Sequence, residues 1–534
     1  MIENVPTDDN APQAEADQAT TEKATTSKPP VKKAPTRKAP AKKTTAKKTP
    51  AKKATTAKAP ANKTTAKKTP AKTTTTAKAP AKKTTAKKSP AKKSPAKKST
   101  TKKPVKAPAN SAKKSAAPQS SAHGREDRPL DIVLYGATGF TGRLVAEYLA
   151  ESAPAELRIG LAGRNVEKLK SVQAGIGGRA EHWPRITANS ADLESLRRMA
   201  RSARVVITTV GPYAKYGKPL TAACAEAGTH YVDLAGEVTF IRESADTFDE
   251  MARRHGARIV HACGFDSIPS DLGVLALHEA ARAADGTGHL GDTDLVFTRL
   301  RGSFSGGTMA SGALEAERLS KDKHARKLTA DPYALSPDWD NDRRSDFDRD
   351  VRGPYYDDVL GTFVGPFVMA AGNARVVRRS DSLMDWAYGP QFHYREGMGT
   401  GSGVRGRMKA AALAAGLAAG TLGMTFGPTR SLAKRFMPEP GEGPSEESRR
   451  NGYFTAKLHS TTALGTQVSG EVSAKGDPGY TATALMISES AITLALGEGL
   501  PERTGVLTPA SGIGVPLIER LRGAGMTITA EVAA

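Results

Sequence analysis

The segment at 130–150, LDIVLYGATGFTGRLVAEYLA, restricts the fold more than any other part of the chain. An apolar stretch is followed by a turn that holds Gly136, Gly139 and Gly142, and then by a helical pattern with apolar residues on one face. In a dinucleotide-binding turn the first glycine permits the tight bend, the second lets the backbone approach a pyrophosphate, and the third lets the helix pack close to the strand. Free N–H groups at the helix N-terminus favour an anion. The segment therefore predicts the first strand, turn and helix of a Rossmann-type domain.

The second apolar stretch, LRIGLAGRN at 157–165, indicates which dinucleotide binds. Where an NAD-dependent enzyme carries an Asp or Glu for the ribose hydroxyls, this chain has Arg164 and Asn165. A guanidinium at this point can pair with a 2′-phosphate, so the sequence favours NADP(H). The alternative is that Arg164 is a solvated residue that opens the next helix. The residues expected to contact the cofactor are Gly136, Thr138, Gly139, Phe140, Thr141, Gly142, Arg164, Asn165, Gly211 and Pro212.

Strand and helix patterns alternate from residue 130 to about residue 269. Strands separated by helical segments of about ten to fifteen residues predict a doubly wound parallel sheet. Ligands bind at the carboxyl ends of the strands in such a sheet, so the turns at 211–213, 236–237 and 264–266 are expected to converge near the nicotinamide.

Beyond residue 269 the strict alternation stops. Antiparallel strands are predicted at 292–302 and 453–474, and helices at 305–319, 482–497 and 515–522. We therefore expect an α/β protein, a Rossmann-type doubly wound parallel sheet with a second α+β domain, preceded by a disordered basic tail. The expected division is a tail at 1–127, an NADP-binding domain at 128–270, a substrate and dimerisation domain at 271–500, and a segment at 501–534 that returns to the Rossmann domain. The cleft between the two folded domains would hold the substrate.

The net charge of +24 is concentrated at the N-terminal end of the chain. Residues 1–130 hold 33 Lys and Arg against 8 Asp and Glu, whereas the other 404 residues hold 46 against 47. No aromatic residue precedes Tyr135, so apolar burial cannot offset the entropy of ordering, and we expect this tail to be disordered. Segments 39–58, 59–78 and 79–98 repeat one pattern of Lys, Ala, Thr and Pro.

This tail resembles in composition the C-terminal tails of linker histones. Its closely spaced ammonium groups can neutralise the phosphates of DNA, and anionic lipid headgroups would satisfy the same charges. A solubilising extension without a partner is the third alternative. The acidic start, MIENVPTDDN, is not a secretory signal, and two cysteines are too few for a disulfide framework. A cytoplasmic protein is expected, either peripheral at the inner face of the plasma membrane or associated with the nucleoid through its tail.

Five motifs carry a family resemblance: YGATGFTG, LAGRN, VGPYAKYG, GTHYVDLAGE and CGFDSIPSDLG. In this order and spacing they resemble the saccharopine dehydrogenase-like oxidoreductases and, within that group, the mycobacterial trans-acting enoyl reductases. The resemblance extends from about Arg128 to the end of the chain and does not include the tail. It implies an NADP-binding domain, a second α+β domain, and delivery of a hydride to a polyketide-derived carbon–carbon double bond in cell-envelope lipid and glycolipid biosynthesis.

A reductase needs a proton donor beside the carbon that accepts the hydride. Tyr213 and Asp266 lie on turns predicted near the nicotinamide and are the candidates, ahead of Tyr388. The structural alternatives are that Tyr213 only packs on its Gly-Pro turn and that Asp266 caps a helix. His230 and Cys263 are expected in the core, and the two cysteines do not make a metal site.

Two segments of the second half allow more than one interpretation. The acidic loop at 336–350 lacks the Gly and the final Glu of a calcium-binding loop, so we expect a solvated surface loop. The uncharged stretch at 410–429, with basic residues on both sides, fits a buried or dimer-forming helix, an interfacial membrane contact or a membrane span. A homodimer through the second domain is a further expectation.

Two other functions stay open alongside an enoyl reductase with a lipid-like or acyl substrate. A saccharopine-type amino-acid or imine dehydrogenase would need basic residues directed at substrate carboxylates. A non-catalytic NADPH-binding protein that tethers the nucleoid or the envelope would bind the cofactor without turnover.

Overall fold

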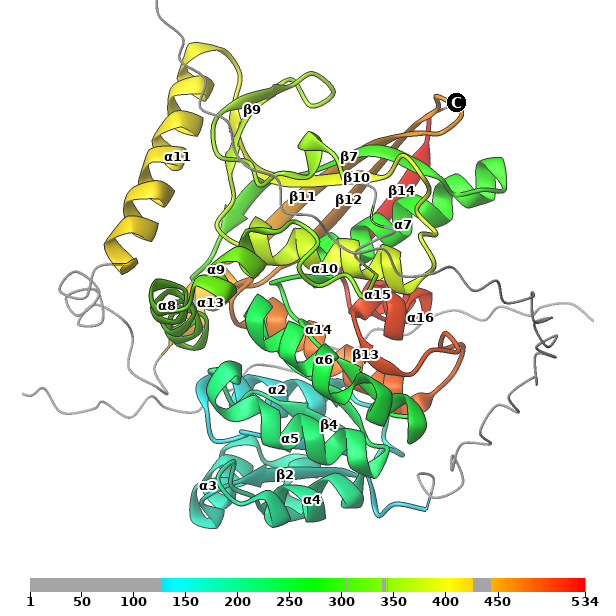
Figure 1. Ribbon diagram of the computed structural model, residues 1–534. Coiled ribbons are helices and arrows are strands. Elements are labelled where there is room, and N and C mark those ends of the chain that lie inside the picture. Colours follow the sequence, from blue (N-terminus) through cyan, green and yellow to red (C-terminus); the bar gives the residue numbers. More distant parts are fainter. Residues whose placement is uncertain (1–126, 304, 339–341, 343, 426–442, 534) are drawn as a thin grey trace, which may run out of the picture. The chain divides into compact units, whose positions relative to one another are not determined.

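The computed structural model describes residues 127–303, 305–338, 342, 344–425 and 443–533 (Figure 1). The tail expected at 1–127 lies outside the described residues, apart from its last residue. Two seven-stranded sheets, here called sheet A and sheet B, organise the described part of the chain.

Sheet A consists of parallel strands. Its strands are β1 (Leu130–Tyr135), β2 (Ile159–Gly163), β3 (Arg185–Thr187), β4 (Ala203–Thr208), β5 (His230–Val232), β6 (Arg258–Val260) and β13 (Gly505–Leu507). Every pair is parallel, and the order is β13-β6-β5-β4-β1-β2-β3. The winding direction reverses between β1 and β4, and ligands bind outside the carboxyl ends of the strands at such a point. The predicted doubly wound parallel sheet is confirmed.

Helices cover both faces of sheet A. They are α2 (Phe140–Ser152), α3 (Val166–Ile176), α4 (Leu193–Ser202), α5 (Tyr213–Ala227), α6 (Val238–Arg254) and α14 (Thr481–Leu496). Because strand side chains alternate, Ile132 and Leu134 enter one core with α2, α3 and α14, whereas Val133 enters a second core with α4 and α5. The helix predicted at 482–497 is thus α14, and it ends at Gly497 in a left-handed conformation.

Sheet B is mixed, as expected for an α+β second part. Its strands are β7 (Leu290–Arg301), β8 (Tyr355–Asp357), β9 (Thr362–Pro366), β10 (His393–Gly401), β11 (Tyr453–Thr462), β12 (Gln467–Lys475) and β14 (Thr527–Val532). The order is β14-β12-β11-β7-β10-β9-β8, with β7 and β10 parallel and the other pairs antiparallel. The remaining elements are α7 (Ile268–Asp285), α8 (Gly306–Lys321), α9 (Lys323–Ala330), α10 (Ala370–Leu383), α11 (Gly403–Thr425), α13 (Glu446–Arg450), α15 (Pro509–Gly512), α16 (Val515–Gly523) and the 3-10 turns η1 (Gly178–His182) and η2 (Asp346–Asp348).

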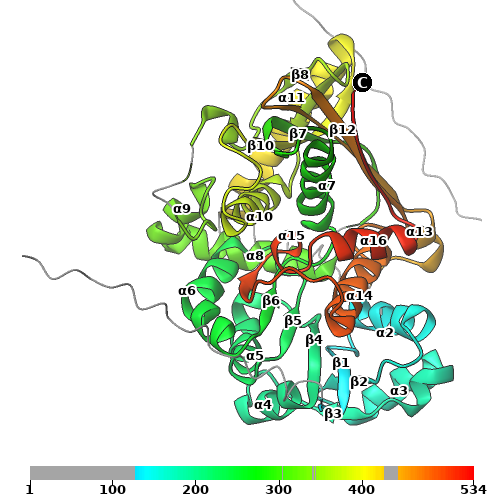
Figure 2. The same cartoon turned by 90° about the vertical axis from the view of Figure 1, so that its right-hand side faces the viewer.

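One continuous core connects the two sheets. Helix α14 contacts α16, and α16 contacts α7, which packs on β11, β12 and β14 of sheet B (Figure 2). Leu272 of α7 and Phe297 of β7 therefore belong to the same cluster as Ile132 of β1. The C-terminal residues contribute to both sheets, since β13 pairs with β6 and β14 with β12. Division of the chain at 127, 270 and 500 stays a prediction.

The expectation of a solvated loop at 336–350 is wrong at Asp348, which is buried. Its carboxylate accepts a hydrogen bond from the Tyr333 hydroxyl (2.9 Å) and pairs with the guanidinium of Arg378 on α10 (3.2 Å). The arginine that neutralises this carboxylate is distant in sequence, so the acidic composition of the loop did not reveal the burial. His230 and Cys263 are buried, as expected.

Helix α11 contains most of the uncharged stretch at 410–429, whose last residues lie outside the described part. It packs against β9, β10 and α8, and most of its residues are exposed (Figure 1). None of the helices in the described part of the chain is long and apolar enough to cross a membrane.

Candidate cofactor and substrate site

The turn between β1 and α2 is shaped by two glycines. Gly136 has a φ of +98°, a conformation that side chains with a Cβ rarely adopt. A Cβ on Gly142 would lie 2.1 Å from the carbonyl oxygen of Gly136, so only glycine allows the helix to start this close to the turn. The Thr209 hydroxyl, at the end of β4, donates to the same oxygen (3.3 Å). The turn is thereby held between β1 and β4, at the reversal point of sheet A.

The N-terminus of α2 fits a pyrophosphate. Its N-cap is Gly139, which provides no side-chain hydrogen bond, and the first turn contains no acidic residue. The backbone N–H groups of Phe140, Thr141 and Gly142 therefore keep their capacity to bind an anion, and the helix dipole favours a negative charge there. These three residues belong to the predicted cofactor set.

The end of β2 presents a cation at the position that distinguishes the two dinucleotides. Arg164 is exposed and forms no ion pair within the described part of the chain, so its guanidinium is available for a 2′-phosphate. Asn165 has a structural task as well, because its Oδ1 accepts a hydrogen bond from Lys168 N (3.0 Å) and caps α3. Contact of either side chain with the cofactor stays a prediction.

A cavity of about 690 Å³ opens at the carboxyl ends of the sheet A strands. Its sheet A side is formed by the start of α2 and the turns after β4, β5 and β6, which contribute Thr141, Gly211, Gly236 and Asp266. The opposite walls come from α8, the start of α10, the C-terminal half of α11 and the loop at 478–479. The three turns predicted to converge therefore meet at one cavity, with Tyr213 and Asp266 in its lining. Tyr388 is fully buried against His278 and Phe392 and does not contribute to this lining.

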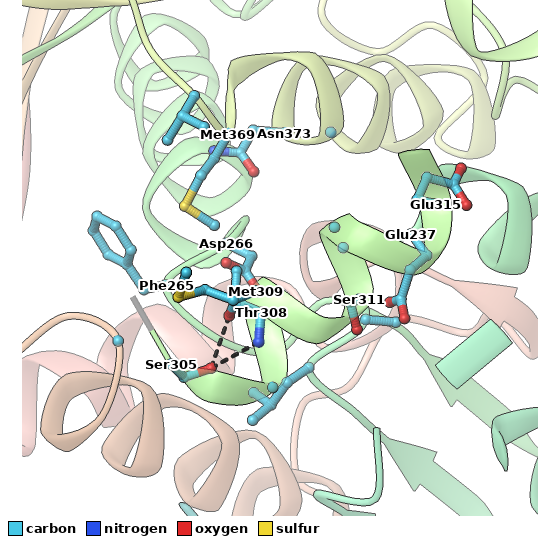
Figure 3. A pocket seen from close by; sticks show the side chains of 18 of the residues that line it. Glu237, Phe265, Asp266, Ser305, Thr308, Met309, Ser311, Glu315, Met369 and Asn373 are labelled. Atoms are coloured by element: carbon cyan, nitrogen blue, oxygen red, sulfur yellow. Dashed lines mark hydrogen bonds between the residues drawn. The ribbon is translucent and has the colours of Figure 1, made fainter. Parts of the chain in front are cut away.

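Three carboxyl groups line the cavity, and each has a raised pKa. Burial, with added repulsion from Glu237 and Asp233, raises the pKa of Asp266 to about 7. Burial also raises the pKa of Glu237 and that of Glu315, although the Ser311 hydroxyl opposes the rise at Glu237 and the Thr239 hydroxyl opposes it at Glu315. Figure 3 shows Asp266 on the side of Phe265 and Met369, and Glu237 and Glu315 on the side of Ser311. Because its pKa lies near neutral pH, the Asp266 carboxyl is available for proton transfer.

Besides these acids, the polar groups of the cavity lining are uncharged hydroxyl and amide side chains. Within the described part of the chain, none of its lining residues is Lys, Arg or His. Apolar side chains and glycines dominate the remainder, including Phe265, Met309, Phe367, Met369 and Leu417. The cavity therefore suits a substrate segment without negative charge.

The hydroxyl of Tyr213 is engaged by the backbone. It donates to the carbonyl of Thr208 (3.1 Å) and accepts from the N–H of Leu234 (3.2 Å), which ties the end of β4 to the turn after β5. The ring stacks on Phe240, and burial raises the phenol pKa well above its ordinary value. A catalytic role of Tyr213 stays a prediction, and the geometry favours the alternative in which Tyr213 positions the turns.

Asp233, which sequence reasoning did not single out, holds two of the converging turns together. Its Oδ1 accepts hydrogen bonds from Ala235 N (3.0 Å) and Ala262 N (3.1 Å), on the turns after β5 and β6. Ala262 has a φ of +63°, a strained conformation for a residue with a Cβ, and Asp233 secures it. The only sequence signal was a carboxylate at the end of an apolar strand.

A buried chain of polar groups supports Asp233 from behind. His261 Nδ1 lies 2.7 Å from Asp233 Oδ2, and His261 Nε2 lies 2.8 Å from the Ser244 hydroxyl. The Tyr231 hydroxyl donates to the same carboxylate oxygen (2.8 Å). Ser244, His261 and Asp233 are all fully buried, so these three residues position the turns and do not face a substrate.

A second buried carboxyl orients the opposite wall. Asn373 lines the cavity and donates from Nδ2 to Glu396 Oε1 (2.8 Å), while its Oδ1 accepts from the Ser267 hydroxyl (3.3 Å). Burial raises the pKa of Glu396 to about 7. Among the described residues no group of His, Cys, Asp and Glu is arranged to hold a metal ion.

Comparison with protein families gives two matches along the chain. Residues 132–260 match the saccharopine dehydrogenase NADP binding domain. Residues 10–129 match a histone H1-like nucleoprotein. The first match includes the glycine turn and Arg164, and the second lies almost entirely outside the described residues.

Comparison with individual proteins extends the similarity over the whole folded part. A trans-acting enoyl reductase of Mycobacterium tuberculosis is 43% identical over 411 residues, which cover 75% of this chain and 98% of that protein. One from Mycobacterium ulcerans is 41% identical over 413 residues, covering 76% and 98%. Among solved structures, saccharopine dehydrogenase from Saccharomyces cerevisiae is 14% identical with a TM-score of 0.42, covering 76% of this chain and 100% of its own.

Proposed function

Because the chain belongs to the family of the mycobacterial trans-acting enoyl reductases, with a saccharopine dehydrogenase NADP-binding domain, we propose that it saturates a carbon–carbon double bond of a neutral acyl substrate with NADPH. Membership of this family already implies an oxidoreductase that uses NADP(H). The double bond and the acyl substrate are the proposal. Cell-envelope lipid biosynthesis is the pathway class that would use such a reduction.

The absence of basic residues from the described lining of the cavity is the observation that carries the proposal. A saccharopine-type dehydrogenase handles amino-acid carboxylates, which need cationic partners when they leave water. Here such carboxylates would instead meet Asp266, Glu237 and Glu315. The cavity volume of about 690 Å³ and its apolar walls suit an acyl chain whose reacting end lies beside Asp266.

When held at the glycine turn and the N-terminus of α2, NADPH would supply a hydride for the β-carbon of the double bond. The Asp266 carboxyl then gives its proton to the α-carbon, so that one C–H bond forms at each carbon and the π bond is lost. The resulting carboxylate recovers a proton from solvent through the open cavity. A pKa of about 7 suits both halves of this cycle, because the group is neither fully protonated nor fully ionised at neutral pH.

Turnover by the full chain tests the proposal directly. NADPH oxidation is measured with 2-enoyl thioesters of increasing chain length and, in parallel, with saccharopine-type amino acid and oxo-acid pairs. Oxidation with the enoyl thioesters alone supports the proposal. Activity with the amino-acid substrates would establish the dehydrogenase alternative, and tight NADPH binding without any turnover would favour the non-catalytic tether.

We infer that the basic tail holds the enzyme on a polyanion, DNA in the first instance. The net +25 of residues 1–130 and the match of residues 10–129 to a histone H1-like nucleoprotein support this inference. Binding through phosphates releases counterions, so the affinity of the full chain for double-stranded DNA should fall steeply and linearly on a logarithmic salt scale. An affinity that does not change with salt would contradict it.

A further inference from the structure

Helix α11 exposes an apolar surface that the described part of the protein leaves largely uncovered. Val404, Met408, Leu413 and Leu422 are 76%, 67%, 42% and 62% exposed. No charged residue occurs from residue 410 to the end of the helix at Thr425. A helix that is apolar around most of its circumference is normally buried, so a further surface should cover α11.

The charge at the start of α11 indicates the chemistry of that surface. Arg405, Arg407 and Lys409 are exposed, and none of them forms an ion pair with a described residue. The whole helix contains no acidic residue. A second copy of α11 would offer these cations no partner, whereas anionic lipid headgroups neutralise them while the adjacent apolar side chains enter the acyl boundary.

The same helix forms part of the cavity wall. Gly416, Leu417, Gly420 and Thr421 line the cavity on its inner side. A Cβ built on Gly416 or Gly420 would meet no atom within 4 Å, so the helix borders open space at these two positions. A bilayer surface against the outer side of α11 would therefore lie one helix away from the cavity, on the side opposite Asp266.

We propose that α11 is an interfacial helix that docks the enzyme on an anionic lipid bilayer, with its apolar side chains among the acyl chains and its three cations at the headgroups. The helix lies along the surface, in keeping with the finding that no described helix can cross a membrane. The role of docking in substrate entry rests on the proposed acyl substrate, whereas docking itself does not.

Flotation of the full chain with phosphatidylcholine vesicles, with and without phosphatidylglycerol, tests docking. The basic tail also binds anionic vesicles, so each measurement is repeated at about 1 M salt, where the screening length falls to about 3 Å and the tail is released. Insertion of apolar side chains is not screened and should persist. We expect a salt-resistant fraction that is largest with phosphatidylglycerol vesicles, since initial docking at low salt uses the cations.

The decisive variant is Met408→Glu/Leu422→Glu, which changes two exposed side chains on the outer face of α11, outside the cavity lining. Its salt-resistant partition should fall at least about tenfold, because these two apolar side chains no longer leave water. Leu464→Glu, at a side chain 73% exposed on the β11–β12 turn, is the matched control and should bind like the unchanged protein. Both variants should retain NADPH affinity, which shows that they fold.

Complete release of the unchanged protein from the vesicles at high salt would overturn the proposal, and so would an equal loss of salt-resistant binding in the control variant. A sedimentation shift from dimer to monomer in the α11 variant would also overturn it, because the surface would then belong to a contact with a second copy. Turnover of a short, soluble enoyl thioester separates this proposal from the enzymatic one. If the vesicle result holds and no thioester is reduced, docking stands and the proposed reaction fails.

Discussion

The two sides of the cavity are built by opposite means. On the sheet A side, Asp233 and His261 connect the turns after β5 and β6 through buried hydrogen bonds, and the carboxyl of Asp266 is held on one of these turns. On the α11 side, the wall consists of two glycines, Leu417 and Thr421, from a helix that is exposed over most of its length. Polar groups that must reach a reacting atom need fixed positions, whereas an apolar wall need only exclude water. For the proposed acyl substrate, this difference would fix the reacting groups on the sheet A side and leave tolerance for chain length to the α11 side.

The largest effect is expected from Asp266→Asn, which removes the proposed proton donor from the sheet A side of the cavity. Turnover of an enoyl thioester should fall about 100- to 10,000-fold, while the dissociation constant of NADPH stays within about twofold. In the unchanged enzyme, turnover should fall as the pH rises through about 7, because only the protonated carboxyl donates.

Asp271→Asn is the control for this prediction. Burial also raises the pKa of Asp271 to about 7, but its carboxylate accepts hydrogen bonds from Ser380 and Ala510 N and is not part of the cavity. Full turnover by the Asp266 variant would assign the proton transfer to another group. The sheet A side of the cavity would then not be the side that carries the reacting acid.

The next largest effect is expected from Asp233→Asn, which loosens the hydrogen bonds behind the turns without touching the cavity. Misplacement of Asp266 should lower kcat about 10- to 100-fold with little change in KM. Loss of the Asp233 charge also lowers the pKa of Asp266, so the falling limb of the pH profile should move to lower pH. That shift distinguishes a positioning role from general destabilisation.

Ser244→Ala serves as the matched substitution for Asp233→Asn. It removes the hydroxyl that contacts His261 Nε2, at the end of this hydrogen-bonded series farthest from Asp233, and should lower kcat less than about threefold. Equal losses in the two variants, with no change in the pH profile, would show that this network stabilises the fold and has no specific effect on Asp266.

A smaller effect is expected from Arg164→Ala at the end of β2. If Arg164 pairs with the 2′-phosphate as predicted, the substitution should weaken NADPH binding about tenfold and leave NADH binding unchanged, as measured by titration calorimetry. Lys168→Ala, on the exposed side of α3, is the control because it removes a nearby cation that is not in the predicted cofactor set. If both substitutions weaken the binding of NADPH and of NADH to the same extent, Arg164 contributes only to the overall positive charge near the cofactor.

The part of this site that depends on local sequence could be predicted. The spacing of Gly136, Gly139 and Gly142 reflects one turn, and strand ends in a parallel sheet meet at one edge, so Tyr213 and Asp266 could be placed at the cavity from the sequence alone. These inferences need only the apolar periodicity of each segment, which identifies strands and helices, and the order of the strands along the chain.

The remaining features depend on contacts between distant segments. Asp233 meets His261 only because β5 and β6 are neighbours and the turns after them bend toward each other. Asp348 is buried because Arg378 of α10 lies beside it, and α11 reaches the cavity because it packs across β9 and β10. Side-chain partners across such distances are set by tertiary packing, for which residue type and spacing contain little signal.

The smallest effect, and the one that tests the apolar side, is expected from Leu417→Ala on the inner face of α11. If Leu417 contacts the acyl chain, its truncation should raise KM about three- to tenfold for long-chain enoyl thioesters, leave short ones unaffected and leave kcat unchanged. Leu422→Ala, on the exposed outer face of the same helix, removes the same atoms outside the cavity lining and should change neither constant in a vesicle-free assay. A KM that rises equally for every chain length would place the acyl chain elsewhere, and α11 would then have no part in binding the substrate.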